Sequence, residues 1–366
     1  MVTKMNKKET FFGCGDIFFF SLAIMSSALF SNLPSILVRT AGNGVPLSAA
    51  LSGVAVLLLI FLISKKLCTR QNSDLITLAE ARFGTIGKYV VSILLLLYLF
   101  LSSLYFLSEL SEFCKLLAFP TSPLWFVVLF FIIAATAGAF GGTESLLRIS
   151  RLTVPMFSTV FLLLVVSVLA GSDFANLFPL LGKGTDKVLS GSLSGIILYS
   201  DIVVVFMLIP FSHYSKARSR AVFSGASLSV LFVFLLLLAY TAKIPYPLSQ
   251  LERFPLYLLS KEVYFGRFFQ RMDAILLLYS SIIGMLSLSA KLYLVASILT
   301  RTFGITAKVV RLLPMSVILF LLASGSSLFP ESILTIILLS AGTGIFAILA
   351  LTALFSGKER SAENEK

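Results

Sequence analysis

An acidic residue lies near the middle of an apolar stretch that is long enough to cross a membrane. The stretch runs from Gly191 to Phe211 and carries Tyr199, Ser200 and Asp201 near its centre. A carboxylate at that depth costs about 2.5–3.5 kcal/mol or more unless it faces protein, water or a ligand. These residues predict a polar site at the membrane midplane, with Asp201 placed to bind an amino group or a cation.

A second apolar stretch, near the start of the chain, combines hydroxyl-bearing residues with a proline. Ser26, Ser27, Ser31 and Asn32 precede Pro34. We expect the helix to be interrupted here, because the polar side chains compete for backbone hydrogen bonds and proline removes a donor. Paired interrupted helices in transporters hold ligands with the backbone groups they free. The alternative is that the small residues only let helices pack closely.

Asp201 could instead belong to a structural ion pair with a buried base. The other candidate charge at mid-span is Lys291, which lies ten residues before Arg301. Its long side chain could therefore extend to the cytoplasmic interface. We favour the interpretation in which Asp201 faces a ligand.

A third helix presents a polar and aromatic face. Tyr98, Tyr105 and Glu109 follow at spacings of seven and four residues, which places them on one side of a helix, and Ser102 lies nearby. This face could line the outer half of a cavity, or it could form an aromatic belt at the membrane interface. The expected ligand-binding residues are Met25, Ser26, Ser27, Ala28, Tyr98, Ser102, Tyr199, Ser200 and Asp201.

The composition is that of an integral membrane protein. Hydrophobic residues make up 58% of the chain and charged residues 13%, and the mean hydropathy is +1.00. The net charge of +12 comes from bases in short loops, which is typical of membrane topology and not of nucleic-acid binding. Three cysteines without CxxC spacing and one histidine predict no disulfide framework, metal site or other cofactor.

About 20 apolar residues cross the hydrocarbon layer as a helix. On that basis we expect ten membrane-spanning helices, at 12–39, 46–64, 88–116, 123–140, 147–170, 191–211, 221–242, 270–299, 308–327 and 331–355. The whole chain, 1–366, would form one polytopic domain, with tails at 1–11 and 356–366 flanking a core at 12–355. Most Lys and Arg residues fall on the side of the termini, so both termini are expected in the cytoplasm.

The connections carry weaker signals. Glu144 and Arg148 are spaced for an ion pair within one helical turn, ahead of Pro155, and we expect an architectural or gating role for these three residues. The segment 243–267 mixes apolar and charged residues around three prolines. It is expected to lie along the outer interface as a short amphipathic helix, or simply to pack over helix ends.

Several of these motifs together resemble the endospore germination permeases, the B subunits of germinant receptors. Glu144, Arg148 and Pro155 are similar to the loop before that family's fifth helix. The segments 173–184 and 246–275 are similar to its outer loops, and the resemblance covers essentially the whole chain. Two positions depart from the family pattern. Asp201 stands where the sixth helix often has Glu, and Tyr279 where the eighth often has Trp, so the identity of the ligand is not carried over.

The resemblance implies a fold and a function that composition does not show. The fold would be the all-α, LeuT-like architecture of the amino acid–polyamine–organocation superfamily, a 5+5 inverted repeat with helices 1 and 6 discontinuous. The protein would lie in the inner membrane of the endospore, with both termini on the spore-core side. It would sense a nutrient germinant, typically an amino acid, together with an A-type membrane subunit and a C-type lipoprotein.

Two other functions compete with nutrient sensing. An ion- or proton-coupled amino-acid transporter could use the same scaffold, although charges within the membrane are sparse. A membrane enzyme is disfavoured, because we find no nucleophile–base pair, metal cluster or phosphate-binding loop in the sequence. We expect contacts with membrane lipids and none with nucleic acid.

Overall fold

The computed structural model describes residues 13–67, 75–208, 217–263, 272–304, 307–325, 341–342 and 344. Within these ranges the chain is helical and contains no strand. The elements, with 3-10 helices written η, are α1 (Cys14–Ser26), η1 (Ser27–Phe30), α2 (Leu33–Ala41), η2 (Gly42–Gly44), α3 (Val45–Leu67), α4 (Leu75–Leu117), α5 (Leu124–Ala170), η3 (Phe174–Leu177), α6 (Thr185–Gly195), η4 (Ile196–Tyr199), α7 (Ile202–Leu208), α8 (Ala217–Lys243), η6 (Leu248–Gln250), α9 (Pro255–Lys261), α10 (Met272–Phe303) and α11 (Lys308–Ser324).

Six helical segments among the described residues are long and apolar enough to cross a membrane. They are Leu33–Lys65, Phe83–Leu117, Leu124–Ala170, Thr185–Leu208, Ala217–Lys243 and Met272–Phe303. The shorter apolar segments Cys14–Phe30 and Val309–Ser324 match the first and ninth predicted spans in part. The tenth predicted span, 331–355, lies outside the described residues except for 341–342 and 344.

The first predicted span is interrupted, as its sequence indicates. The α-helical pattern of α1 ends at Ser26, and the single 3-10 turn η1 follows before the backbone becomes extended at Ser31, with φ −98° and ψ 175°. Ser27 and Ser31 donate their hydroxyl hydrogens to backbone carbonyls three residues earlier, at 2.7 and 2.8 Å. Pro34 then lies in the first turn of α2, where its missing N–H leaves no intrahelical bond unmade. The expected discontinuity is confirmed.

The sixth predicted span has the same construction. Its first half, α6, begins at Thr185, six residues before the predicted start at Gly191, and leads directly into the 3-10 turn η4. The second half, α7, resumes at Ile202. Gly195, at the junction, allows close approach to α3, because a Cβ there would lie 2.8 Å from the Oγ of Ser52. The discontinuity of this helix is also confirmed.

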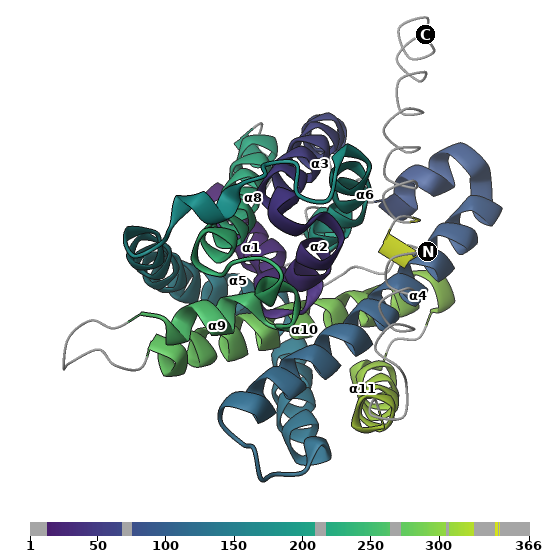
Figure 1. Ribbon diagram of the computed structural model, residues 1–366. Helices are drawn as coiled ribbons and strands as arrows, with labels where there is room; N and C mark the ends of the chain where they lie inside the picture. Colours follow the sequence, from purple (N-terminus) through teal and green to yellow (C-terminus); the bar gives the residue numbers. More distant parts are fainter. Residues whose placement is uncertain are drawn as a thin grey trace, which may run out of the picture.

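The two interrupted segments lie together inside the bundle (Figure 1). α2 contacts α6 while α1 contacts α7, so the two segments run in opposite directions, as an inverted repeat requires. α5 and α8 pack against α1, and α4 and α10 contact η1. Four phenylalanines reinforce this packing: Phe30 lies 5.4 Å from Phe157, and Phe161 lies 4.8 Å from Phe232, between ring centroids.

The predicted fourth and fifth spans meet without an intervening connection. The structure has a single element, α5, in which Gly142 lies between the two predicted helices. The φ of Gly142 is +75°, a conformation that glycine adopts without the steric cost of a Cβ. A change of direction at one residue therefore replaces the connection expected at 141–146.

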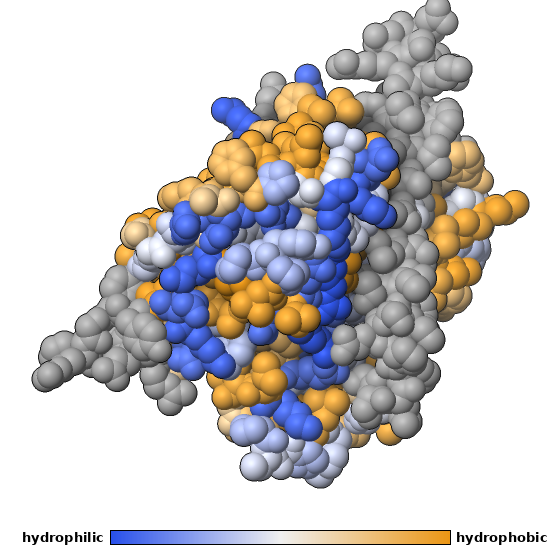
Figure 2. Space-filling view, in the orientation of Figure 1, coloured by the Kyte–Doolittle hydropathy of each residue, from blue (hydrophilic) through white to orange (hydrophobic). Residues whose placement is uncertain are grey.

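The surface exposes many large apolar side chains, as contact with lipid requires. Large apolar side chains are exposed along the long helices, for example Leu152 at 73%, Val166 at 64% and Phe130 at 62%. In Figure 2, hydrophilic side chains cross the middle of one face and hydrophobic side chains surround them. The apolar exterior and the polar groups gathered inside it define a multi-pass membrane protein.

Candidate functional site

Asp201 lies at the second interruption, between η4 and α7. Its Oδ1 atom accepts hydrogen bonds from the hydroxyls of Tyr98, at 3.0 Å, and Ser102, at 3.1 Å, both on α4. Its Oδ2 atom lies 2.8 Å from the Nζ atom of Lys291 on α10. Side chains from two other helices, α4 and α10, therefore converge on this carboxylate.

Lys291 is buried, with 1% of its side chain exposed. Its Nζ atom also lies 5.2 Å from the centre of the Phe106 ring, a distance suited to a cation–π interaction. The alternative in which this side chain extends to the cytoplasmic interface is therefore wrong. Lys291 can stay buried because the carboxylate of Asp201 neutralises its ammonium group. Removing either partner would leave an unpaired charge in the interior.

A small cavity adjoins the ion pair. Its volume is about 20 Å³, which is room for one water molecule. It lies between the two interruptions, α4 and α10, and its lining residues are Ser27, Ala28, Ser31, Leu33, Ser102, Tyr105, Phe106, Ile197, Leu198, Ser200, Asp201 and Lys291. The polar groups predicted from the two interrupted helices thus share one site.

Five of the nine predicted ligand-binding residues line this cavity: Ser27, Ala28, Ser102, Ser200 and Asp201. Tyr98 lies behind them and holds Asp201 through its hydroxyl.

The other three predicted residues are buried outside the lining. Met25 is part of the hydrophobic core, and Ser26 donates its hydroxyl hydrogen to the carbonyl of Ala23 at 3.1 Å. The hydroxyl of Tyr199 lies toward α3, near Gly53.

Four apolar residues of the lining were not predicted as part of the site. Leu33, Phe106, Ile197 and Leu198 complete the cavity. Phe106 follows Ser102 by four residues, so helical periodicity would have placed it on the same side of α4. The positions of Ile197 and Leu198 depend on η4, whose 3-10 geometry the sequence does not specify.

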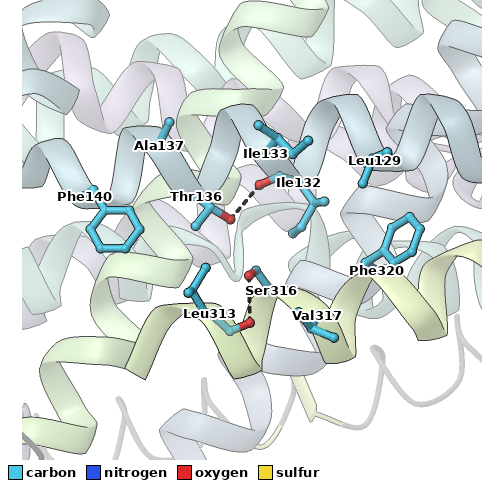
Figure 3. Close-up of a pocket in the computed structure, with 10 residues that line it drawn as sticks. All are labelled: Leu129, Ile132, Ile133, Thr136, Ala137, Phe140, Leu313, Ser316, Val317 and Phe320. Atoms are coloured by element: carbon cyan, nitrogen blue, oxygen red, sulfur yellow. Dashed lines mark hydrogen bonds between the residues drawn. The ribbon is translucent and has the colours of Figure 1, made fainter. Parts of the chain in front are cut away.

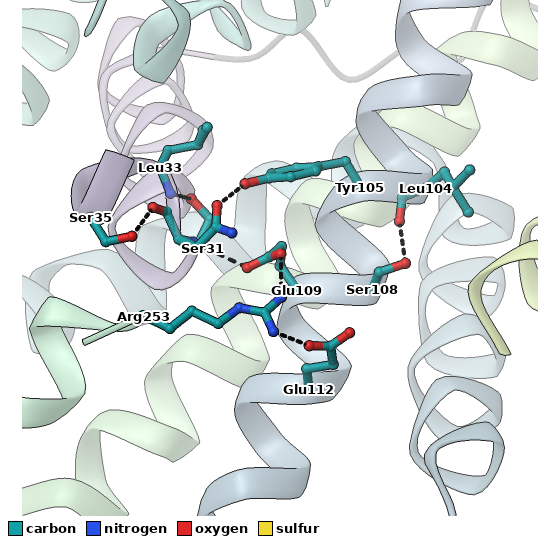
Figure 4. A network of polar contacts seen from close by, with 10 residues as sticks. Ser31, Leu33, Ser35, Leu104, Tyr105, Ser108, Glu109, Glu112 and Arg253 are labelled. Atoms are coloured by element: carbon teal, nitrogen blue, oxygen red, sulfur yellow. Dashed lines mark hydrogen bonds and ion pairs between the residues drawn. The ribbon is translucent and has the colours of Figure 1, made fainter. Parts of the chain in front are cut away.

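A second polar cluster lies near the first interruption (Figure 4). Glu109 accepts a hydrogen bond from Arg253 at 2.7 Å and one from the backbone N–H of Asn32 at 3.2 Å. Arg253 also pairs with Glu112, and the hydroxyl of Tyr105 donates to the side-chain oxygen of Asn32. Tyr105 and Glu109 are both 4% exposed, which argues against an interfacial aromatic belt.

The residues expected to have an architectural role lie apart from the cavity. Glu144 and Arg148 form the predicted ion pair within one turn of α5, at the surface. Pro155 is exposed within the same helix, two turns further along. An exposed pair of this kind stabilises a helix by only a few tenths of a kcal/mol.

A groove near the surface is apolar and has no ionisable group in its lining (Figure 3). This groove, of about 400 Å³, runs between α5 and α11 and is lined by residues such as Leu129, Phe140, Leu313 and Phe320. The residues that line it include no acid or base. Its position among exposed apolar side chains is suited to contact with lipid or with another helix.

The model of one protein family, described as "Spore germination protein", matches residues 17–327. The chain belongs to the spore germination protein family. The resemblance seen in the sequence is therefore confirmed. No curated protein matches the sequence significantly.

Several solved structures share the fold of this chain. MhsT in complex with L-phenylalanine has a TM-score of 0.73 at 16% identity, covering 93% of this chain and 89% of that one. Mhp1, a nucleobase-cation-symport-1 family transporter with bromovinylhydantoin bound, has a TM-score of 0.68 at 15% identity, covering 93% and 78%. A manganese transporter from Eremococcus coleocola has 0.59 at 13%, covering 97% and 81%.

At these identities the similarity shows the fold alone. It is the LeuT-like fold, as expected. Family and fold together indicate a membrane receptor or transporter. The family and the fold are typical of permeases and not of enzymes.

Proposed function

We propose that this protein is the nutrient-sensing membrane subunit of a spore germination receptor, and that it binds an amino acid at the midplane cavity. The observation that carries the proposal is the ion pair between the buried Lys291 and the partly buried Asp201, beside a cavity where two interrupted helices meet. Buried ionisable groups at mid-membrane mark ligand or ion sites by default, because structural packing alone does not require them.

The ligand would lie between the first, third, sixth and eighth predicted spans. The residues that line the cavity would contact it directly, with Asp201 orienting its amino group and Ser27, Ala28, Ser102 and Ser200 forming the walls. Tyr98 would hold Asp201 in place, and Met25, Ser26 and Tyr199 would support the interrupted backbone behind the walls. Glu144, Arg148 and Pro155 would fix α5 and regulate its movement.

Sensing requires that the ligand change a conformational equilibrium which partners detect. A ligand shifts such an equilibrium only by its different affinities for the two states. The cavity is too small for an amino acid as it stands, so ligand binding must move the lining segments apart. An A-type membrane subunit and a C-type lipoprotein would detect that movement in the inner membrane of the endospore, with both termini facing the spore core.

The alternative function is an ion- or proton-coupled amino-acid transporter. The shared fold supports it, since the structural relatives include a transporter bound to L-phenylalanine and a cation symporter. The ion pair argues against a coupled transporter, because Lys291 already neutralises Asp201, the one acid among the described residues that line the cavity. A coupling cation there would have to compete with the ammonium group of Lys291.

Spores of the source organism provide the test. Asp201→Asn, introduced at the native gene, should abolish nutrient-triggered release of dipicolinic acid while the protein level in the spore membrane stays normal. Asp186→Asn is the matched control, because Asp186 is an exposed acid in the first turn of α6. Loss of amino-acid uptake by growing cells with normal germination would identify a transporter and overturn the proposal.

A further inference from the structure

We infer that the cavity takes a zwitterionic ligand by opening the Asp201–Lys291 pair, so that the ligand's ammonium group binds Asp201 and its carboxylate binds Lys291. The inference rests on the proposed function and specifies how the same cavity recognises its ligand. In this inference Lys291 binds the ligand's carboxylate. The sequence alone allowed its side chain to extend to the cytoplasmic interface instead.

The charges of the cavity favour a ligand that carries both signs. Among the twelve lining residues, Asp201 is the only acid and Lys291 the only base, and they lie 2.8 Å apart. A ligand with a single charge would pair with one of them and leave the other uncompensated in the interior, which is unfavourable. A zwitterion supplies a partner for each, so that one ion pair is exchanged for two.

Three of the four serine hydroxyls of the lining can accept a hydrogen bond from the ligand but not donate one. Ser27, Ser31 and Ser200 each donate their hydrogen to the backbone carbonyl three residues earlier, at 2.7–2.8 Å. A hydroxyl has one hydrogen and two lone pairs, so these oxygens can still accept from an ammonium group but have nothing left to donate to a carboxylate. The cationic donor of the lining is Lys291, which suits it to the carboxylate.

The size of the cavity makes opening selective. A volume of about 20 Å³ holds one water molecule, so an amino acid enters only if Asp201 and Lys291 separate. The flexible stem of lysine allows its ammonium group to move. A zwitterion compensates the separation with its own charges, whereas an uncharged solute of equal size does not.

The remaining lining predicts the ligand's side chain. Leu33, Phe106, Ile197 and Leu198 supply an apolar wall. Once Asp201 and Lys291 are engaged, the residues that line the cavity offer no further charge. We therefore expect amino acids with uncharged side chains to bind in preference to Asp, Glu, Lys and Arg.

Ligand-dependent thermal stabilisation of the purified full-length protein tests the inference, because a ligand that binds the folded state raises Tm, and at a fixed concentration a tighter ligand raises it more. The probes are L-alanine, L-valine and L-phenylalanine, each with its carboxamide, which is a cation, and its deaminated carboxylic acid, which is an anion. In the wild type at least one amino acid should bind about tenfold or more tightly than either of its own analogues.

Single charge removals should reverse this preference in opposite directions. Lys291→Gln leaves a negative site, which should bind the carboxamide more tightly than the amino acid. Asp201→Asn leaves a positive site, which should prefer the deaminated acid. Lys243→Gln and Asp186→Asn, which remove charges outside the cavity, are the matched controls and should keep the wild-type order.

The possible results distinguish failure of this inference from failure of the proposed nutrient-sensing function. If an amino acid binds but Lys291→Gln keeps the wild-type order, the inference is overturned while the proposed function stands. If no probe stabilises the wild type, both fail. Should a single variant not fold, Asp201→Asn/Lys291→Gln removes both charges together without leaving one unpaired. Its preference for the amino acid should disappear, and retention of that preference would overturn the inference.

Discussion

The backbone N–H of Asn32 donates a hydrogen bond to Oε2 of Glu109, 77 residues away along the chain, at 3.2 Å. Asn32 is the residue that precedes α2, so its N–H belongs to the backbone freed by the first interruption. A carboxylate is well suited to this place, because the N-terminus of a helix carries partial positive charge. Glu109 thereby fixes the start of α2 relative to α4, next to the cavity.

Arg253 pairs with that carboxylate and holds it in place, and its removal should destabilise the protein. Glu109 is only 6% exposed in its side chain, whereas Arg253 is 25% exposed. Arg253→Gln should therefore cost about 2 kcal/mol, since an acid is left poorly compensated in the interior. A fall in Tm measured in detergent would report this loss.

Two variants make that measurement specific. Arg253→Gln/Glu109→Gln should recover part of the lost stability, because it replaces an unpaired charge by neutral amides. Arg148→Gln breaks a surface pair in which Arg148 is 76% exposed, and should change stability by only a few tenths of a kcal/mol. Equal losses for Arg253→Gln and Arg148→Gln would show that burial of Glu109 is not the cause.

The hydroxyl of Tyr98 orients Asp201 and should contribute to ligand affinity without contacting the ligand. Tyr98→Phe removes one of the two hydrogen bonds that Oδ1 accepts and keeps the buried ring. We expect ligand affinity to fall by about tenfold and stability by about 1 kcal/mol. Tyr240→Phe is the control, because its hydroxyl bonds the carbonyl of Ser249, outside the cavity. An equal loss of affinity in both variants would contradict the assigned role.

Helix packing around α1 leaves no space for a side chain at Gly225. A Cβ there would lie 2.0 Å from the Oγ of Ser21 and 2.7 Å from the carbonyl oxygen of Phe18. Gly225→Ala should therefore force α1 and α8 apart and cost about 1–3 kcal/mol. Gly15→Ala places the same methyl group in α1 with no atom within 4 Å, and should be neutral or slightly stabilising. Thermal unfolding of the two variants would separate crowding from helix propensity.

The positions of the helices and both interruptions could be predicted from the sequence because their causes are local. Apolar length defines a span, and serines with a proline weaken one. The partner of Asp201 could not be predicted in this way. Lys291 is 90 residues further along the chain, and whether its side chain meets Asp201 or extends to the interface depends on how α10 packs against η1 and α7. Periodicity within α10 does not encode that choice.

The apolar lining illustrates the same limit. Ser102 was predicted from its place beside a polar face, while Phe106, one turn further, was not distinguished from the many other phenylalanines of the chain. Likewise Tyr199 was expected at the site because it is next to Asp201, but the 3-10 turn η4 directs it toward α3. A single turn of a different helix type rotates side chains by an amount that sequence spacing does not reveal.

Ligand binding should not depend on sodium. In the structure the ammonium group of Lys291 already lies beside Asp201, where a bound cation would find its only charged ligand among the lining residues. Replacing sodium by choline at constant ionic strength should therefore leave the ligand-dependent rise in Tm unchanged. The same replacement in Lys291→Gln should strengthen binding, since sodium can then occupy Asp201 in competition with the ligand's ammonium group. A wild type that requires sodium would instead support the coupled transporter, because the cation would then contribute to the site despite the resident lysine.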